Sequence, residues 1–272
     1  MPFPLLYLLS DLFFVIVYYL IGYRRKVVIT NLRNSFPEKS EGELHKIEKA
    51  FYRYLLDLTL EGFKMLTISS NEVKKRMACE DFSMIEDLKL RDQNFIYVLG
   101  HQGNWEWIGH SLSRHHVTQT DSLYHPLSNK FFDWLMYKMR TRAGTGLFPM
   151  QSSIREMIKR KNQLNGTAFI ADQTPSSSEG VYWMTFLNQD TPVFTGTEKI
   201  AKKFNYPVVF ISVKKIKRGY YVMSFKKVTD KPLETTDGFI TETHTHMLED
   251  DIKRQPEIWL WSHRRWKHRR KV

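Results

Sequence analysis

The chain has 272 residues, of which 42% are hydrophobic and 14% aromatic, enough for one large α/β domain or two small ones. Its formal net charge of +12 predicts a polyanionic partner, which is a nucleic acid, an anionic membrane or an acidic protein. The one cysteine, Cys79, excludes an intramolecular disulfide framework and a multi-cysteine zinc site.

The amino-terminal segment 3–22 is apolar apart from Ser10 and Asp11, and about 20 apolar residues span the core of a bilayer. Unlike a secretory signal peptide, it follows no Lys or Arg and precedes no small-residue cleavage site. Positive charges at 24–26 mark the cytoplasmic side. We expect residues 1–25 to be a membrane anchor, spanning the bilayer or lying in its interface. The alternative is an internal core helix, since Asp11 facing lipid costs a few kcal/mol.

Two further helices are predicted after the anchor. Residues 27–34 continue the helical pattern, and Pro37 ends it. Ser40 and Glu43 have the spacing of a capping box, with apolar residues at helical spacing behind them. These helices predict a helical arm over residues 26–75.

Short apolar runs alternate with helical segments over the rest of the chain. The predicted strands are 95–99, 120–124, 167–171, 208–213 and 220–228, the last of them an antiparallel edge strand. The predicted helices are 105–114, 131–142, 153–160, 197–204 and 239–254. This alternation predicts an α/β fold, with helices on the faces of a sheet, over residues 76–272.

One polar turn follows the first of these strands, in the stretch Leu99-Gly100-His101-Gln102-Gly103-Asn104-Trp105-Glu106. Ligands of open α/β sheets bind at the carboxyl ends of strands, where His101 is expected. A carboxylate at Glu106 that folds back onto the ring would accept the Nδ1 proton and leave Nε2 free as a general base. No Ser elbow or nearby Cys supplies a nucleophile, which favours direct attack by a substrate hydroxyl on an activated acyl group. A histidine that only caps a turn is the alternative.

The pattern His101-x₄-Glu106 resembles the H-x₄-D/E motif of the glycerolipid and lysophospholipid acyltransferases. With its flanking segments, the chain is similar to the bacterial lipid A biosynthesis late acyltransferases, the lauroyl and myristoyl transferases. The segments that carry this resemblance are Arg25-Lys26-Val27-x₃-Asn31-Leu32-x₂-Ser35-Phe36-Pro37, Tyr124-x-Pro126-Leu127-x-Asn129 with Arg140 and Arg142, Ile170-Ala171-Asp172-Gln173, and Phe186 with Thr195-Gly196-Thr197. Several motifs in one order are far more specific than the His–Glu pair alone.

The resemblance implies a mixed, largely parallel sheet and an enzyme that acylates a lipid hydroxyl, above all that of a lipid A precursor. An amino-acid lipid or a lysophospholipid is the alternative acceptor. The donor would be a fatty acyl thioester on acyl carrier protein or coenzyme A, with no metal and no other cofactor. The implied location is the bacterial inner membrane, with the catalytic domain on the cytoplasmic face.

Five further residues receive substrate-binding roles from their positions in these segments. Arg142, or Arg140, would contact the acceptor's phosphate, which the guanidinium fork suits. Asp172 would support the site, and Asn104 and Gly196 would lie along the substrate. The plainer alternatives are a solvated helix end for the arginines, a turn for Asp172 and Gly196, and a helix cap, which we favour, for Asn104.

The carboxyl-terminal tail 262–271 carries six Lys or Arg residues and a tryptophan. It is expected to hold the domain on an anionic membrane or to attract acyl carrier protein, unless it is a solvated, partly disordered end. His244 and His246 are expected at the surface, without metal. A basic membrane- or nucleic-acid-binding protein without catalysis is the competing class, but no nucleic-acid-binding motif is present, so we expect no nucleic acid partner.

Overall fold

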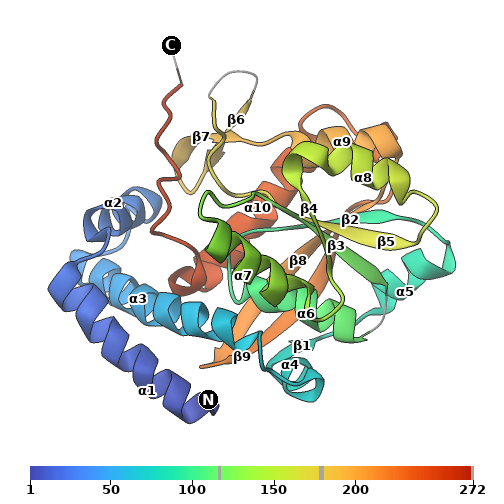
Figure 1. The fold of residues 1–272 in the computed structure, drawn as a ribbon. Coiled ribbons are helices and arrows are strands. Elements are labelled where there is room, and N and C mark those ends of the chain that lie inside the picture. The colour runs from blue at the N-terminus through green and yellow to red at the C-terminus, as the bar shows by residue number, and fades with distance from the viewer. Residues whose placement is uncertain (116–117, 178–180, 271–272) are drawn as a thin grey trace.

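A computed structural model describes residues 1–115, 118–177 and 181–270 (Figure 1). Its α-helices are α1 (Phe3–Phe14), α2 (Arg25–Ser35), α3 (Glu41–Lys64), α4 (Ser70–Arg76), α5 (Ser83–Leu90), α6 (Trp105–His115), α7 (Lys130–Thr141), α8 (Ser153–Lys159), α9 (Gly196–Phe204) and α10 (Phe239–Arg254). Its strands are β1 (Met77–Cys79), β2 (Phe95–Leu99), β3 (Gln119–Tyr124), β4 (Gly146–Pro149), β5 (Asn165–Ile170), β6 (Tyr182–Phe186), β7 (Gln189–Val193), β8 (Val208–Lys217) and β9 (Tyr220–Thr229). Shorter helical turns are η1 (Val15–Ile21, a π-helix), η2 (Met150–Ser152), η3 (Pro232–Glu234) and η4 (Pro256–Ile258).

Within the described residues, the main sheet has the order β1-β9-β8-β2-β5-β3-β4, and β6 and β7 form a separate hairpin. Its strands pair in parallel except for β8 and β9, which are antiparallel. This confirms the predicted mixed, largely parallel α/β sheet. The prediction that β9 is an edge strand is wrong, because Met77 to Cys79 pair with its outer side. The strand formed by Met77–Cys79, β1, has three residues, which are too few to show an alternating pattern.

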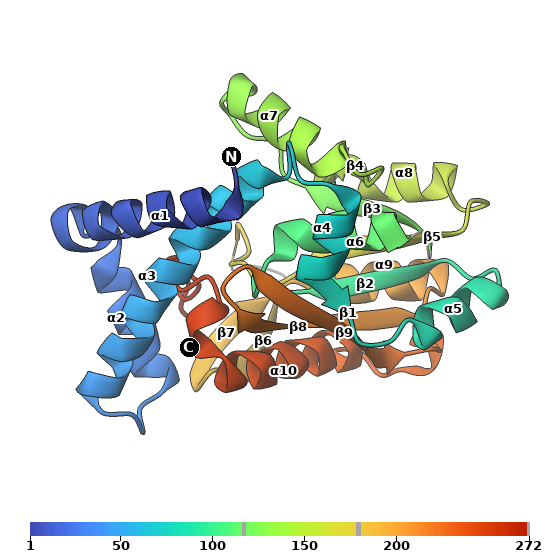
Figure 2. The same cartoon turned by 90° about the horizontal axis from the view of Figure 1, so that it is seen from below.

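Helices cover both faces of the sheet, and the alternation of side chains in β2 shows why. Phe95, Tyr97 and Leu99 pack into one apolar core beneath α4, α5 and α6, whereas Ile96 and Val98 pack into the other beneath α9 and α10. A strand whose every residue is buried fits a sheet enclosed on both sides. In Figure 2, α4 and α6 lie on one side of β8 and β9, and α10 lies on the other.

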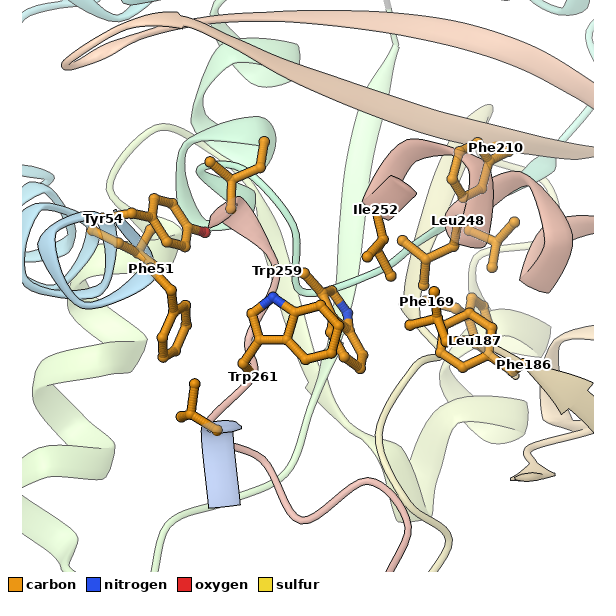
Figure 3. Packing of buried hydrophobic residues seen from close by; sticks show 14 of the residues in the cluster. Phe51, Tyr54, Phe169, Phe186, Leu187, Phe210, Leu248, Ile252, Trp259 and Trp261 are labelled. Atoms are coloured by element: carbon orange, nitrogen blue, oxygen red, sulfur yellow. The ribbon is translucent and has the colours of Figure 1, made fainter. Parts of the chain in front are cut away.

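The second core continues into the amino-terminal helices through two tryptophans. Trp259 and Trp261 are fully buried and stand between α3 and the body of the domain (Figure 3). Their apolar neighbours in that view include Phe51 of α3 on one side and Phe186 on the other. The helices before residue 65 therefore share a core with the sheet domain.

The amino-terminal helix is interrupted where the sequence predicted continuity. The helix that starts at Phe3 ends at Gly22, whose φ of 65° lies in the left-handed region, and Arg24 follows with a φ of 52°. A new helix, α2, then begins at Arg25. The capping box of α3 is confirmed, because the Ser40 side chain accepts from the Glu43 backbone and the Glu43 carboxylate accepts from the Ser40 backbone.

Helix α1 and the π-turn after it form a segment, Phe3–Ile21, that is long and apolar enough to cross a membrane. It lies against α3, and its Asp11 pairs with Arg218 at the β8–β9 turn, at 2.8 Å. The charge that would be costly in lipid therefore faces the protein. The apolar side chains on the opposite face are exposed: Leu5, Leu8, Leu12, Phe13, Val15, Tyr19, Leu20 and Ile21.

The carboxyl-terminal tail is packed for half of its length, which contradicts the alternative of a solvated, partly disordered end. Arg265 is buried and donates to the carbonyl of Pro192 at 2.8 Å, and Trp266 donates to Thr191 at 2.8 Å. His268 still contacts the carbonyl of Pro175, at 3.0 Å. The last described residues, Arg269 and Arg270, are exposed, and Lys271 lies outside the described part.

Candidate active site

His101 lies in the turn that follows the central strand β2. The turn is too tight for side chains at its two glycines. A Cβ on Gly100 would come within 2.6 Å of Leu248, and one on Gly103, whose φ is +58°, within 2.4 Å of Val213. The backbone N–H of His101 donates to Asp172 at 2.8 Å. The turn is therefore held by packing against Leu248 and Val213 and by a hydrogen bond to the Asp172 carboxylate.

The imidazole of His101 is held by Asp172, which follows the neighbouring strand β5. Nδ1 of His101 lies 2.6 Å from Oδ1 of Asp172, and Oδ2 accepts the Trp259 indole N–H at 2.8 Å. Burial would raise the pKa of Asp172, but the neighbouring His101 and these hydrogen bonds outweigh it and lower the pKa to about 2. An ionised Asp172 accepts the Nδ1 proton, so Nε2 keeps its lone pair. That nitrogen faces the Gln173 amide at 3.3 Å.

The prediction that the Glu106 carboxylate contacts His101 is wrong. Glu106 forms a two-pronged ion pair with Arg140, with distances of 2.6 and 2.9 Å. Burial would raise the pKa of Glu106, but the charge and hydrogen bonds of Arg140 hold it below its usual value. The physical reason lies in the strand register, which pairs Leu99 with Ile170 and so brings residues 101 and 172 side by side.

The two arginines have different surroundings. Arg140, on α7, lines the cavity described below and pairs with Glu106. Arg142 instead donates to the carbonyls of Met65 and Ile68, at 3.0 and 2.9 Å, and does not line the cavity. The structure therefore does not bring Arg142 to the predicted acceptor phosphate.

Asn104 and Gly196 also differ from each other. Asn104 is buried outside the cavity, and its side-chain oxygen accepts the Trp107 backbone N–H at 3.0 Å, as a cap of α6. Its amide donates to Glu61 at 2.7 Å. Gly196 lines the cavity where α9 begins, and a Cβ there would meet nothing within 4 Å. Its lack of a side chain is thus not required by local packing.

A cavity of about 530 Å³ opens beside His101. Polar groups in its lining include His101, Glu106, Arg140 and Gln173. Its apolar lining residues include Leu99, Trp105, Ile108, Leu112, Leu123, Leu127, Met136, Leu147, Met150, Phe169, Ile170, Phe194 and Ile200. A largely apolar cavity of this size, with a few polar groups, has the form of a small-molecule site.

The chain matches the family described as bacterial lipid A biosynthesis acyltransferase over residues 1–268. It belongs to this family. The relatives it resembles include the lipid A biosynthesis lauroyltransferase of Escherichia coli (strain K12), 25% identical, with 99% of this chain and 87% of the relative covered. The lipid A biosynthesis acyltransferase of Haemophilus influenzae (strain ATCC 51907 / DSM 11121 / KW20 / Rd) is 24% identical, with 92% and 79% covered. The lipid A biosynthesis palmitoleoyltransferase of Escherichia coli (strain K12) is 19% identical, with 99% and 87% covered.

Membership of the lipid A biosynthesis acyltransferase family makes this protein an acyltransferase. The competing prediction of a basic binding protein without catalysis is therefore wrong. In this acyltransferase, two residues near His101, Trp259 and Gln173, were not identified from the sequence, because both are distant from His101 along the chain. Trp259 supports Asp172 from 87 residues away, and no local pattern signals such a contact. Gln173 belongs to the segment Ile170-Ala171-Asp172-Gln173, but its proximity to Nε2 of His101 depends on the register of β2 and β5.

A second correction concerns His244, which was expected at the surface of the acyltransferase. It lies on the buried face of α10, and burial lowers its pKa to about 4. His246, two residues on, is exposed as expected, with 59% of its side chain accessible. In the described part of the chain, no group of three or more His, Cys, Asp or Glu residues is placed to hold a metal ion.

Proposed function

We propose that the enzyme transfers a fatty acyl chain from a thioester to a hydroxyl of a lipid A precursor, with His101 as general base. The observation that carries this proposal is the orientation of one imidazole. Asp172 holds Nδ1 at 2.6 Å, and His101 lines an apolar cavity large enough for a fatty chain. The described residues that line this cavity include no cysteine, and neither of its serines, Ser122 and Ser153, is hydrogen-bonded to His101 as an activated nucleophile would be.

The reaction follows from this arrangement. An acceptor hydroxyl that replaces the Gln173 amide at Nε2 gives its proton to His101 as its oxygen attacks the thioester carbonyl. The ionised Asp172 stabilises the imidazolium that forms. When the tetrahedral intermediate collapses, the carbon–sulfur bond breaks and the thiolate takes the proton from His101. The ester, a free thiol and a neutral histidine remain.

Arg140 supplies positive charge where the reaction develops negative charge. Its guanidinium is paired with Glu106, which fixes its direction, and both residues line the cavity. Gly196 and Thr197, at the amino end of α9, line the same cavity, and the Thr195 side chain does not cap that end. The partial positive charge of a helix amino end favours an oxyanion. We assign the acceptor's phosphate or the developing oxyanion to these groups of the cavity lining.

The donor and acceptor follow from chemistry and from the relatives. Relatives named as lauroyl and palmitoleoyl transferases of lipid A biosynthesis support a fatty acyl donor and a lipid A precursor as acceptor. The net charge of +12 suits an anionic carrier, and both the acidic acyl carrier protein and the phosphorylated coenzyme A are anionic. Exposed cations near the carboxyl end, Arg264, Lys267, Arg269 and Arg270, supply part of that charge.

Two apolar surfaces support an enzyme that works at a membrane, which we propose to be the bacterial inner membrane at its cytoplasmic face. One is the exposed face of α1, which lies along the domain and so favours an interfacial anchor over a spanning one. The other is the outer face of α7, where Phe131, Phe132, Trp134 and Tyr137 are exposed. Aromatic side chains suit the boundary between lipid and water. Because α7 also carries Arg140, this surface borders the cavity that would take up a lipid.

The test is acyl transfer by the purified full chain in detergent, with acyl-acyl carrier protein and a lipid A precursor, read by mass spectrometry. His101→Ala is expected to lower the rate by about 10² or more. His246→Ala, at an exposed histidine, is the matched control and should leave the rate unchanged. Retention of activity by His101→Ala would reject the general base. Acylation of an amino-acid lipid or a lysophospholipid, but not of the lipid A precursor, would reject the acceptor.

A further inference from the structure

A buried carboxylate joins the amino-terminal helix to the turn that carries His101. Glu61, near the end of α3, has no exposed surface. Its Oε1 accepts the Tyr7 hydroxyl at 2.8 Å, and its Oε2 accepts the Asn104 amide at 2.7 Å and the Tyr221 hydroxyl at 2.9 Å. Three separate segments, α1, the catalytic turn and β9, thus meet at one side chain.

The turn is tied to α3 at further points. The backbone carbonyl of Glu61 accepts the Trp107 indole N–H at 3.0 Å. Tyr54, two turns earlier on α3, donates to the carbonyl of Gly103 at 2.6 Å. Residues 103 to 107 are therefore held to α3 on both sides of Asn104. Because His101 lies just before this stretch and Glu106 lies within it, a shift of α3 relative to the sheet would move both.

A carboxylate in this place is costly, which argues that its geometry is used. Burial raises the pKa of Glu61. Removal of a buried ionisable group from water costs several kcal/mol unless hydrogen bonds compensate, and an apolar side chain often fills such a place at no loss of stability. An apolar side chain would not orient its neighbours, whereas each Glu61 oxygen fixes the positions of the groups that donate to it.

We propose that Tyr7 of the amino-terminal helix positions the His101 turn through Glu61 and Asn104, so that α1 is part of the catalytic unit as well as an apolar anchor. Tyr7, Glu61 and Asn104 are positioning residues, and none of them lines the cavity. This inference rests on the proposed function of His101. It predicts that loss of one hydroxyl on α1 lowers turnover without weakening donor binding.

The experiment compares Tyr7→Phe with Ser10→Ala in the full chain in detergent. Both variants lose one hydroxyl that α1 donates to a carboxylate of α3, because Ser10 donates to Asp57 at 2.7 Å. Of these two hydroxyls, only that of Tyr7 reaches Glu61. Tyr7→Phe should lower kcat about five- to tenfold, the usual effect of losing one ordinary hydrogen bond, with KM for the acyl thioester unchanged. Ser10→Ala should keep kcat even where it lowers the melting temperature.

A second readout does not depend on turnover. The ¹³Cε1 resonance of His101, assigned by its loss in His101→Ala, should shift or broaden in Tyr7→Phe and stay in place in Ser10→Ala. If the wild-type chain transfers no acyl group but this pattern appears, the proposed function fails and the positioning role stands. If Tyr7→Phe matches Ser10→Ala in both kcat and the His101 resonance, the positioning role is overturned.

Discussion

The Asp172 carboxylate lies 2.6 Å from Nδ1 of His101 because the two residues follow paired positions of adjacent parallel strands. The carboxylate thereby fixes which ring nitrogen keeps its lone pair. Asp172→Asn is expected to lower kcat/KM by about 10² to 10⁴, because an amide neither fixes this tautomer nor stabilises the imidazolium. Asp237→Asn, at a fully exposed carboxylate, is the control.

The pH dependence of that reaction follows from the same contact. Asp172 keeps its charge down to about pH 2, and the pKa of Glu106 is also held below its usual value. On the acid side, kcat/KM of the wild type should therefore fall with a slope of no more than one proton, because these two carboxylates stay ionised. A slope of two in a plot of log kcat/KM against pH would contradict this assignment.

The pair of Glu106 and Arg140 leads to a different expectation. Arg140→Met leaves the Glu106 carboxylate in a poorly solvated place without its cation, so we expect a loss of about 2–3 kcal/mol in the free energy of unfolding. Glu106→Gln should lower kcat, because Arg140 loses the carboxylate that fixes its direction. The double variant Glu106→Gln/Arg140→Met should be more stable than the sum of the single changes predicts. Urea unfolding and steady-state kinetics measure these outcomes, and an unchanged kcat in Glu106→Gln would contradict the role given to this ion pair.

Local sequence patterns predicted most of the helices and strands, but they did not predict which residues contact His101. The strand at 95–99 and the helix at 239–254 agree with the structure at both ends, the strand because it is an unbroken apolar run. The strand β1 has only three residues, and β7 contains Asp190 and Pro192, which are depleted in strands, so neither forms a clear sequence pattern. The position of His101 was predictable because it follows a buried strand.

The partner of His101 was not predictable in the same way. The interval from His101 to Glu106 is local, whereas the choice between Glu106 and Asp172 depends on how β2 and β5 pair. Register is a property of the whole sheet. Arg142 was misplaced for the same reason, since its carbonyl partners, Met65 and Ile68, are more than 70 residues away.

The buried His244 should make the stability of the protein depend on pH. Its pKa is about 4 in the folded protein and about 6.5 in the unfolded chain, so the unfolded chain binds the extra proton between these values. Stability is then full above pH 6.5 and falls as the pH falls towards 4, by about 3 kcal/mol from this residue. Urea unfolding at pH 7, 5 and 4 should show a smaller decrease in His244→Gln than in the wild type. His246→Gln, at the exposed neighbour, should follow the wild type, and an equal decrease in all three proteins would refute the assignment.

The cavity beside His101 should set the length of the acyl chain. It runs along α6 from Trp105 to Leu112, a distance of about 10 Å at 1.5 Å per residue, with Gly109 in its lining. A Cβ on Gly109 would lie 3.3 Å from the hydroxyl of Thr145, which also lines the cavity. A larger side chain at this position must therefore extend into the cavity.

Gly109→Leu is expected to shift the preferred donor to a shorter acyl chain, with the rate for the shortest donors retained within about threefold, because the His101 end of the cavity is unchanged. Competition among saturated acyl-acyl carrier proteins of graded length, read by mass spectrometry of the product, measures the preference. Gly42→Leu, where a Cβ meets nothing, is the matched control. An unchanged chain-length preference in Gly109→Leu would place the acyl chain outside this cavity.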